Sequence, residues 1–355
     1  MCIRDRSSPV TLNDFDIFTG TLEDGSLLVF SNRLSSSNRF EDSLSAVNLF
    51  ETFTPAVDST PQTINAASTL RSARVGQTLI VEAGGELGDN FTSVGATLNV
   101  DAGSVGTNVN AFSSTVNISG GEVGSGFDAN DSTVNISGGE IGVVFTANSG
   151  STVNISGGDV GAFFRANDGS TVNVTGGIVG NNFDAESGSE VNILGGIVGG
   201  FFDAGSGSTV NILGGTIGDN FDVLDGSTVN ILGGTIGDFF DVQNGGTLNI
   251  SGGIFGDNFD ARSGSTVNIF ATEFSLNGSP IDASTLGEPF TIFDRGEDVV
   301  LSGVFADGTL FDFDLNSNNP FFSSLDFFDS GSTLTITLVP VACLLYTSPS
   351  PRDRG

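Results

Sequence analysis

The chain has 355 residues, a formal net charge of −31 and a sequence pI near 4.1, and all eleven of its basic residues are arginines. Phosphate recognition needs clusters of Lys and Arg, so this charge argues strongly against nucleic-acid binding. The 51 glycines and 31 phenylalanines, beside one Tyr and no Trp, indicate many turns and aromatic side chains used as filling. No apolar run is long enough to form a membrane-spanning helix.

The two ends of the chain look foreign to the rest. A DNA string that encodes Met1 to Asp5 has a reverse complement that lies within a coding string for Cys343 to Ser348. We therefore interpret residues 1–6 and 343–355 as translated sequencing adapter and the remainder as a fragment. Both cysteines fall in these ends, so no disulfide or thiolate chemistry is expected and the redox compartment stays open.

Residues 7–60 lack the repeat that follows, but part of them matches a later stretch of the chain. Phe18 to Phe30 aligns with Leu301 to Phe313, because both segments share a Gly, an Asp-Gly pair and alternating apolar positions. Asp-Gly flanked by such alternation predicts a β-hairpin. We interpret residues 7–60 as a β cap segment that would close a preceding solenoid.

Residues 61–270 form a repeat array, with an irregular entry over residues 61–77. From there one unit returns every eighteen or nineteen residues, eleven times in all. The copies open at Thr78, Thr97, Thr115, Thr133, Thr152, Thr171, Glu190, Thr209, Thr228, Thr247 and Thr266.

Each unit predicts about three short strands and three turns. Thr-Val-Asn-Ile alternates polar and β-branched apolar residues with the period of a strand. Gly-Gly is expected to end that strand, a short apolar-Gly step follows, and Phe-Asp-Ala or Phe-Asp-Val makes the third strand. This is the content of one coil of a parallel β-helix, so we predict an all-β solenoid of about 19-residue coils, with right-handed winding favoured.

Stacking explains why residue types recur, because coils about 4.8 Å apart pair in register and put like on like. We predict an internal aromatic column, with Val109 as its one misfit, made of Phe127, Phe145, Phe164, Phe183, Phe202, Phe221, Phe240 and Phe259.

Residues 271–342 lose the repeat and are predicted to form a C-terminal β cap. Segments 298–302, 309–315 and 332–338 are expected to be antiparallel strands of that cap. Their expected role is to cover the open end of the array, whose unpaired strand edges would otherwise template aggregation.

One outward column carries carboxylates in five successive coils, at Asp184, Asp203, Asp222, Asp241 and Asp260. A bound calcium ion would relieve their repulsion, but solvent-screened acid on a soluble surface is the preferred interpretation. The calcium-binding nonapeptide pattern fits poorly, since its third glycine comes one residue late here. A glycosidase pair is not indicated either, because any stacked Asp column gives closely spaced carboxyls. We expect no catalytic residues and no cofactor.

A second outward column holds an asparagine in ten successive coils, two residues after the Thr column, from Asn99 to Asn268. Amide ladders that support the stack are the preferred interpretation. The flat Thr and Asn rows also resemble those of ice-binding solenoids, which leaves ice binding as an alternative.

The Thr-Val-Asn-Ile-x-Gly-Gly and Phe-Asp pattern over residues 78–270 resembles the coils of secreted bacterial β-solenoids, in particular autotransporter and two-partner-secretion adhesin passengers. That resemblance implies an extracellular or cell-surface location and non-enzymatic adhesive or structural work. Its expected partner is an extracellular polysaccharide or another cell surface. A polysaccharide-binding or polysaccharide-cleaving β-helix is the alternative, and the oligomeric state is left open.

Overall fold

The computed structural model describes residues 17–21, 27–31, 60–281, 285–296, 298–317 and 326–340. The chain divides into two compact units, Met1–Ser59 and Thr60–Gly355. In the first unit, β1 (Ile17–Thr21) and β2 (Leu27–Ser31) pair antiparallel, with Phe18 opposite Phe30. This pairing confirms the predicted hairpin. The adapter-like ends lie outside the described residues.

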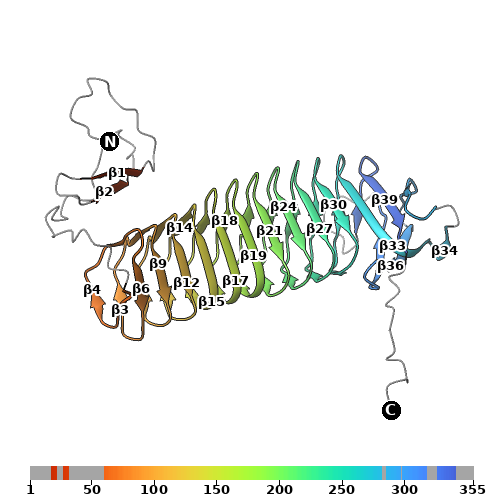
Figure 1. Cartoon of the computed structure of the whole chain (residues 1–355). Helices are drawn as coiled ribbons and strands as arrows, with labels where there is room; N and C mark the ends of the chain where they lie inside the picture. The colour runs from red at the N-terminus through yellow and green to blue at the C-terminus, as the bar shows by residue number, and fades with distance from the viewer. Residues whose placement is uncertain are drawn as a thin grey trace, which may run out of the picture. The chain divides into compact units, whose positions relative to one another are not determined.

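The second unit is a parallel β-solenoid whose coils follow one another along a rod (Figure 1). Its described residues form strands and no helix, so none of them makes a helical membrane span. β3 (Gln62–Ile64) lies in the irregular entry. In each coil that follows, the Thr-Val-Asn-Ile segment forms the first strand. These first strands are β6 (Thr78–Val81), β9 (Thr97–Val100), β12 (Thr115–Ile118), β15 (Thr133–Ile141), β17 (Thr152–Val160), β19 (Thr171–Val179), β21 (Glu190–Ile193), β24 (Thr209–Ile212), β27 (Thr228–Ile231), β30 (Thr247–Ile250) and β33 (Thr266–Leu276).

Where the second strand is separate from the first, it has only two residues and follows the corner, which is Gly-Gly in most copies. These strands are β4 (Ala67–Ser68), β7 (Glu86–Leu87), β10 (Ser104–Val105), β13 (Glu122–Val123), β22 (Ile197–Val198), β25 (Thr216–Ile217), β28 (Thr235–Ile236) and β31 (Ile254–Phe255).

The third strand carries the Phe-Asp step and belongs to a separate 12-stranded sheet. Its members are β5 (Ser72–Ala73), β8 (Thr92–Val94), β11 (Asn110–Phe112), β14 (Phe127–Asn130), β16 (Phe145–Ala147), β18 (Phe164–Ala166), β20 (Asp184–Ala185), β23 (Phe202–Ala204), β26 (Phe221–Val223), β29 (Asp241–Val242), β32 (Asp260–Ala261) and β38 (Phe327–Phe328).

Equivalent residues of neighbouring coils pair directly with one another. Thr209 pairs with Thr228 in the first strands, and Asp203 pairs with Asp222 in the third. This register confirms the parallel β-helix that the repeat predicts. It also means that every position of the unit becomes a column of like side chains along the rod.

The prediction that Gly-Gly ends the first strand is wrong in three coils. β15, β17 and β19 each run on through the glycine pair, and the register shifts there, as at Ile136, Ser137 and Glu140. A side chain on Gly138 would meet the backbone oxygen of Ser119 at 2.4 Å, so the corner has no room for one. The glycines therefore let a bulged strand turn the corner as well as break it.

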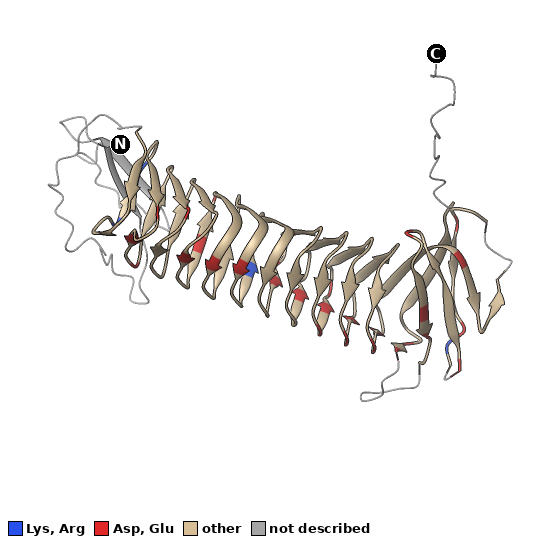
Figure 2. Cartoon of the chain, turned by 90° about the horizontal axis from the view of Figure 1, so that it is seen from below, with Lys and Arg blue, Asp and Glu red and all other residues tan. Residues whose placement is uncertain are grey.

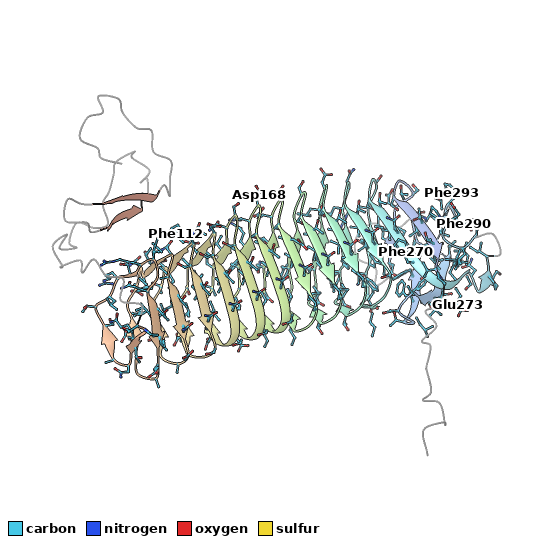
Figure 3. The ribbon with its side chains drawn as sticks, viewed as in Figure 1. Phe112, Asp168, Phe270, Glu273, Phe290 and Phe293 are labelled. Carbon is cyan, nitrogen blue, oxygen red and sulfur yellow. The ribbon has the colours of Figure 1, made fainter. Side chains whose placement is uncertain are left out.

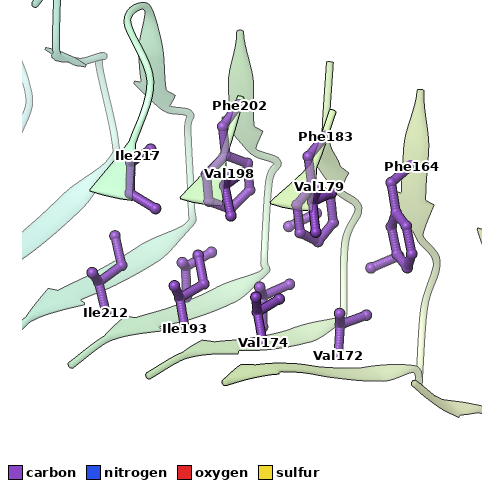
Figure 4. Packing of buried hydrophobic residues seen from close by; sticks show 14 of the residues in the cluster. Phe164, Val172, Val174, Val179, Phe183, Ile193, Val198, Phe202, Ile212 and Ile217 are labelled. Atoms are coloured by element: carbon purple, nitrogen blue, oxygen red, sulfur yellow. The ribbon is translucent and has the colours of Figure 1, made fainter. Parts of the chain in front are cut away.

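The interior is a stack of apolar columns (Figure 4). The eight predicted phenylalanines are at most 1% exposed, and successive ring centroids lie between 4.7 and 5.1 Å apart. Most pairs are stacked, but Phe164 and Phe183 meet edge to face at 63°. Val109 takes the same buried place in an early coil, and Phe91 fills it one coil before. The valines and isoleucines of the first two strands complete the core.

The C-terminal end is closed by strands that fold back over the last coil. β36 (Val300–Phe305) pairs antiparallel with β33 and with β37 (Leu310–Asp314), and Leu301 lies opposite Phe313. The hairpin of β1 and β2 pairs Phe18 with Phe30, and the hairpin of β36 and β37 pairs the aligned residues Leu301 and Phe313. The two segments that align in sequence therefore form hairpins with the same register. β34 (Ser279–Pro280) and β35 (Pro289–Thr291) complete this part, where Figure 3 places Phe270, Glu273, Phe290 and Phe293.

The prediction that all three cap strands are antiparallel is wrong for the last one. β39 (Thr333–Leu338) is antiparallel to β35, but it runs parallel to β33, with Thr333 opposite Thr266. β38 likewise runs parallel to β32. Gly331-Ser-Thr-Leu-Thr-Ile repeats the Gly-Ser-Thr-Val-Asn-Ile with which coils begin, so residues 326–338 resume the array after the excursion that forms the hairpin.

Candidate functional surfaces

The outer surface of the array consists of columns, and three of them carry distinct chemistry. Thr and Asn project from the first strands, Asp projects from the third strands, and large apolar residues project around the second strands. Viewed from below, acidic residues recur from coil to coil while basic residues are rare (Figure 2).

The asparagine column is an unbroken hydrogen-bonded ladder. Each Asn Nδ2 donates to the Oδ1 of the Asn one coil earlier, at 2.8 to 3.0 Å, in all nine steps from Asn99 to Asn268. At the far end the Thr335 hydroxyl donates to Asn268 Oδ1 at 2.7 Å. This geometry supports the interpretation that the amides hold the stack together.

The five predicted aspartates do lie in one column on the third strands. Asp184 pairs with Asp203, Asp222 with Asp241, and Asp241 with Asp260 across neighbouring coils. Two arginines face the column. Arg165 approaches Asp184 at 3.3 Å, and Arg262 binds Asp241 and also reaches Asp260 at 3.7 Å.

The carboxylates are more enclosed than an exposed, solvent-screened face would be. Asp241 is 9% exposed, and its Oδ1 has no hydrogen-bond partner among the described residues. Burial first, then the charges of Asp241 and Asp203, raise the pKa of Asp222 to about 6. Burial and the charge of Asp241 likewise raise the pKa of Asp260 to about 6. Asp222, Asp241 and Asp260 are therefore less open to solvent than the acidic face that the sequence predicts.

The Asp column is the candidate calcium site that the sequence offers. Within the part of the chain that the structure describes, no group of three or more Asp, Glu, His or Cys residues is close enough to hold an ion. Arg262 already neutralises part of the charge at Asp241, its nearest carboxylate. Calcium binding stays a prediction that a titration must test.

The residue before each inner phenylalanine adopts a left-handed backbone in every coil of the array. Asn182, Asn220 and Asn258 have φ between 59° and 64°, values that asparagine tolerates well. In the coil before each of these asparagines, Phe163, Phe201 and Phe239 hold the same conformation at φ of 59° to 63°. A bulky residue there costs on the order of 1 to 3 kcal/mol in backbone strain.

These three phenylalanines point away from the core, at 54% to 55% exposure. Two further apolar columns flank the second strands. Leu194, Leu213 and Leu232 directly follow the first strands, at 46% to 49% exposure. Ile197 and Ile254 open second strands and Ile178 holds the equivalent place in β19, at 44% to 60% exposure. We call these nine residues the apolar side.

Sequence reasoning missed the apolar side, although the sequence carries a signal for it. Phe163-Phe164, Phe201-Phe202 and Phe239-Phe240 are doublets, and only the second member of each belongs to the interior column. From Phe163 to Asn258 the first member recurs at every second coil, alternating with Asn. That two-coil period is the pattern that distinguishes an outward column from a core column.

Comparisons with known proteins add little. No family model and no curated protein matches the chain. A search of solved structures finds a crystal structure of a TibC-catalysed hyper-glycosylated fragment of TibA, covering TibA residues 55–350. It is 19% identical, spans 59% of this chain and 84% of that fragment, and gives a TM-score of 0.36. A likeness this weak carries no argument, so the functional proposal rests on the geometry of the array.

Proposed function

We propose that this chain is a non-enzymatic, extracellular or cell-surface β-solenoid that serves as a structural or adhesive rod. One observation carries the proposal: the array displays whole columns of like side chains in register, where a catalytic site would need unlike groups converging on one point. A column repeated at each coil offers many weak contacts to a repetitive partner such as a polysaccharide or another cell surface.

Repetition strengthens weak binding because many sites are held on one rod. Once one site is engaged, its neighbours on the same rigid rod bind at high effective concentration, so avidity exceeds the affinity of one site by roughly 10² or more. The interior column and the amide ladder supply the rigidity that this requires. An adhesive rod should therefore lose retention steeply when coils are removed.

The test compares the full chain with a variant that lacks residues 190–227, which removes two whole coils and joins Ser189 to Thr228 in register. Beads coated with either protein are passed over cellulose, chitin, polystyrene and bacterial cells under flow. We expect the full chain to be retained on at least one surface, and the shortened chain to be retained less.

Reducing-sugar release from the same polysaccharides is measured in parallel. Retention without release supports the proposal. Release of sugars would contradict its non-enzymatic part and favour a polysaccharide-cleaving β-helix. Absence of retention on every surface would contradict its adhesive part.

Ice binding is the less favoured use of the Thr and Asn columns. In the ladder each Asn Nδ2 already donates to the Oδ1 of the Asn one coil earlier, so the amides are engaged within the protein. A thermal hysteresis assay on the full chain tests this alternative, and we expect no hysteresis.

A further inference from the structure

The apolar side gathers nearly all the large apolar residues that the array leaves exposed. Between residues 100 and 270, its nine members and the adjoining Val143 and Val144 are the only large apolar side chains that are well exposed. All of them lie along the second strands and the two corners that flank these strands. The other sides of the same coils expose polar residues, so the distribution does not follow from the repeat alone.

Folding within the chain does not explain the outward phenylalanines. Asn182 and Asn220 show that the left-handed corner position accepts asparagine in neighbouring coils. Phe201, between them, strains the backbone and stays 54% exposed. A residue that strains the backbone and still stays half exposed in the folded chain indicates a contact made with something else.

The size of the surface suits a protein partner. Nine large apolar side chains, each about half exposed, offer on the order of 700 Å². A standard-size interface buries about 800 Å² on each partner. Leucine and isoleucine offer nothing to the hydroxyl groups of a glycan, so the surface as a whole fits another apolar face better than a polysaccharide.

A second copy of this chain matches the surface in spacing. Two rods laid side by side share the same coil rise, so their columns stay in step over many coils. When the rods run antiparallel about a two-fold axis between the coils of Phe201 and Asn220, every corner phenylalanine faces an asparagine. Phe163 faces Asn258, Phe201 faces Asn220, and Phe239 faces Asn182, so each ring enters the gap left by a smaller side chain.

The positions of the aspartates also favour antiparallel pairing. The residue before the corner is Asp219, Asp238 or Asp257 in the last three of these six coils, and Ala162, Asn181 or Gly200 in the first three. Antiparallel pairing sets each of these aspartates against an uncharged residue. Asp159, in the column that contains Ile178, faces Ile254. Parallel pairing about an axis along the rod would instead bring the corner aspartates toward the leucine column.

We propose that two copies of the chain pair antiparallel through the apolar side, with the corner phenylalanines of one copy interleaved between those of the other. The interface is isologous and closes as a dimer. This goes beyond the proposed function, because it assigns one side of the rod to self-association and leaves the Thr, Asn and Asp columns free to face other partners.

Sedimentation velocity of the full chain tests the proposal, at protein concentrations from about 1 to 100 μM. We expect a concentration-dependent monomer to dimer transition. It should strengthen with added salt, because salt screens the repulsion between two chains of net charge −31. The variant Phe163→Asn/Phe201→Asn/Phe239→Asn should dissociate at least tenfold more readily. It uses the residue found at the same backbone position in the neighbouring coils, and its circular dichroism and thermal unfolding report that it folds.

A matched control removes an exposed phenylalanine elsewhere. Phe293 is 86% exposed in the C-terminal region, so Phe293→Asn should leave the dimer constant unchanged. Orientation is read by disulfide formation after Cys2 and Cys343 are replaced by Ser. A mixture of the Asn181→Cys and Asp238→Cys chains should form the mixed disulfide, and Asn181→Cys alone should not cross-link.

Four results would overturn the inference. These are a monomer throughout the concentration range, a dimer that survives in the folded triple variant, efficient cross-linking of Asn181→Cys with itself, and open-ended growth beyond the dimer. Retention on the neutral polysaccharides cellulose and chitin is a further measurement. A monomer whose retention on cellulose or chitin depends on the three phenylalanines would assign the apolar side to glycan binding instead.

Discussion

Phe163 and Phe164 are neighbours in the chain and have opposite environments. Phe164 is fully buried with its ring 4.8 Å from that of Phe145, while Phe163 is 55% exposed on a left-handed backbone. The inner column fills the same position in every coil from Phe127 to Phe259. The outer column holds phenylalanine at every second coil over the six coils from Phe163 to Asn258. An unbroken column serves the stability of the stack, whereas a column with its own period indicates a role outside it.

The largest effect is expected in the inner column. Phe202→Ala removes a fully buried ring that stacks at 4.9 Å on Phe183 and 4.7 Å on Phe221. The cavity should lower the free energy of unfolding by about 3 to 5 kcal/mol, measured by denaturant titration. A loss no larger than that of Phe201→Ala, the neighbouring residue in the chain, would contradict the distinction between the inner and outer columns.

The amide ladder is expected to give the next effect. Asn230 donates to Asn211 and accepts from Asn249, each at 2.8 Å, so Asn230→Ala leaves two neighbouring amides short of a partner. We expect a loss of about 1 to 3 kcal/mol in the same titration. Thr228→Ala, on the same strand and side, is the control and should change the free energy of unfolding much less.

The Asp column predicts a dependence of stability on pH. The folded pKa of Asp222 is about 6, against an ordinary value of 3.8, so the folded chain binds the proton more tightly than the unfolded chain does. Its contribution to stability is therefore fully present below about pH 4 and is lost as the pH rises through about 6. Asp260 acts in the same direction.

Asp222→Asn removes this penalty. The variant should be more stable by about 1 kcal/mol at about pH 7.5, a value discounted for solvent screening, and should show little gain at about pH 4. Thermal unfolding at the two pH values measures both. Asp168→Asn, at an exposed corner position (Figure 3), is the control and should show neither gain. Equal effects of the two variants would contradict a special environment for Asp222.

The outer column is expected to give a small effect of opposite sign to the inner one. Phe201→Asn relieves a strained left-handed residue, so we expect a gain of up to about 1 kcal/mol in monomer stability. Asn220→Phe should lose a similar amount. A marked loss on Phe201→Asn, measured by unfolding at concentrations where the chain is monomeric, would mean that the outer ring supports the fold.

Calcium is expected to have the smallest effect. Arg262 already binds Asp241, and no described cluster offers three ligands, so calcium should shift the unfolding temperature no more than sodium at equal ionic strength. A rise in unfolding temperature that EDTA reverses would establish the cation column instead.

The repeat made the coil, the register and the interior column predictable, because like residues at a fixed spacing can pair in only one way. The bulged strands at Gly138 and the parallel strand at Thr333 were not predicted. Glycine permits both a strand break and a bulge, so the Gly-Gly pair does not distinguish the two. The hairpin at residues 300–314 separates the parallel strand at Thr333 from the array, so that strand does not follow at the spacing of the repeat. The half-burial of Asp222 depends on side chains of neighbouring coils, and the outward turn of Phe201 depends on a backbone angle. Neither follows from an apolar and polar pattern.

An experimental structure of the full chain tests the central claim most directly. The account predicts that Phe127 to Phe259 form one continuous interior row, with a ring in every coil about 4.8 Å from the next, and that Phe163, Phe201 and Phe239 stand outside it. Rings of the first set that face solvent, or that lie at irregular spacing in separate cores, would contradict it.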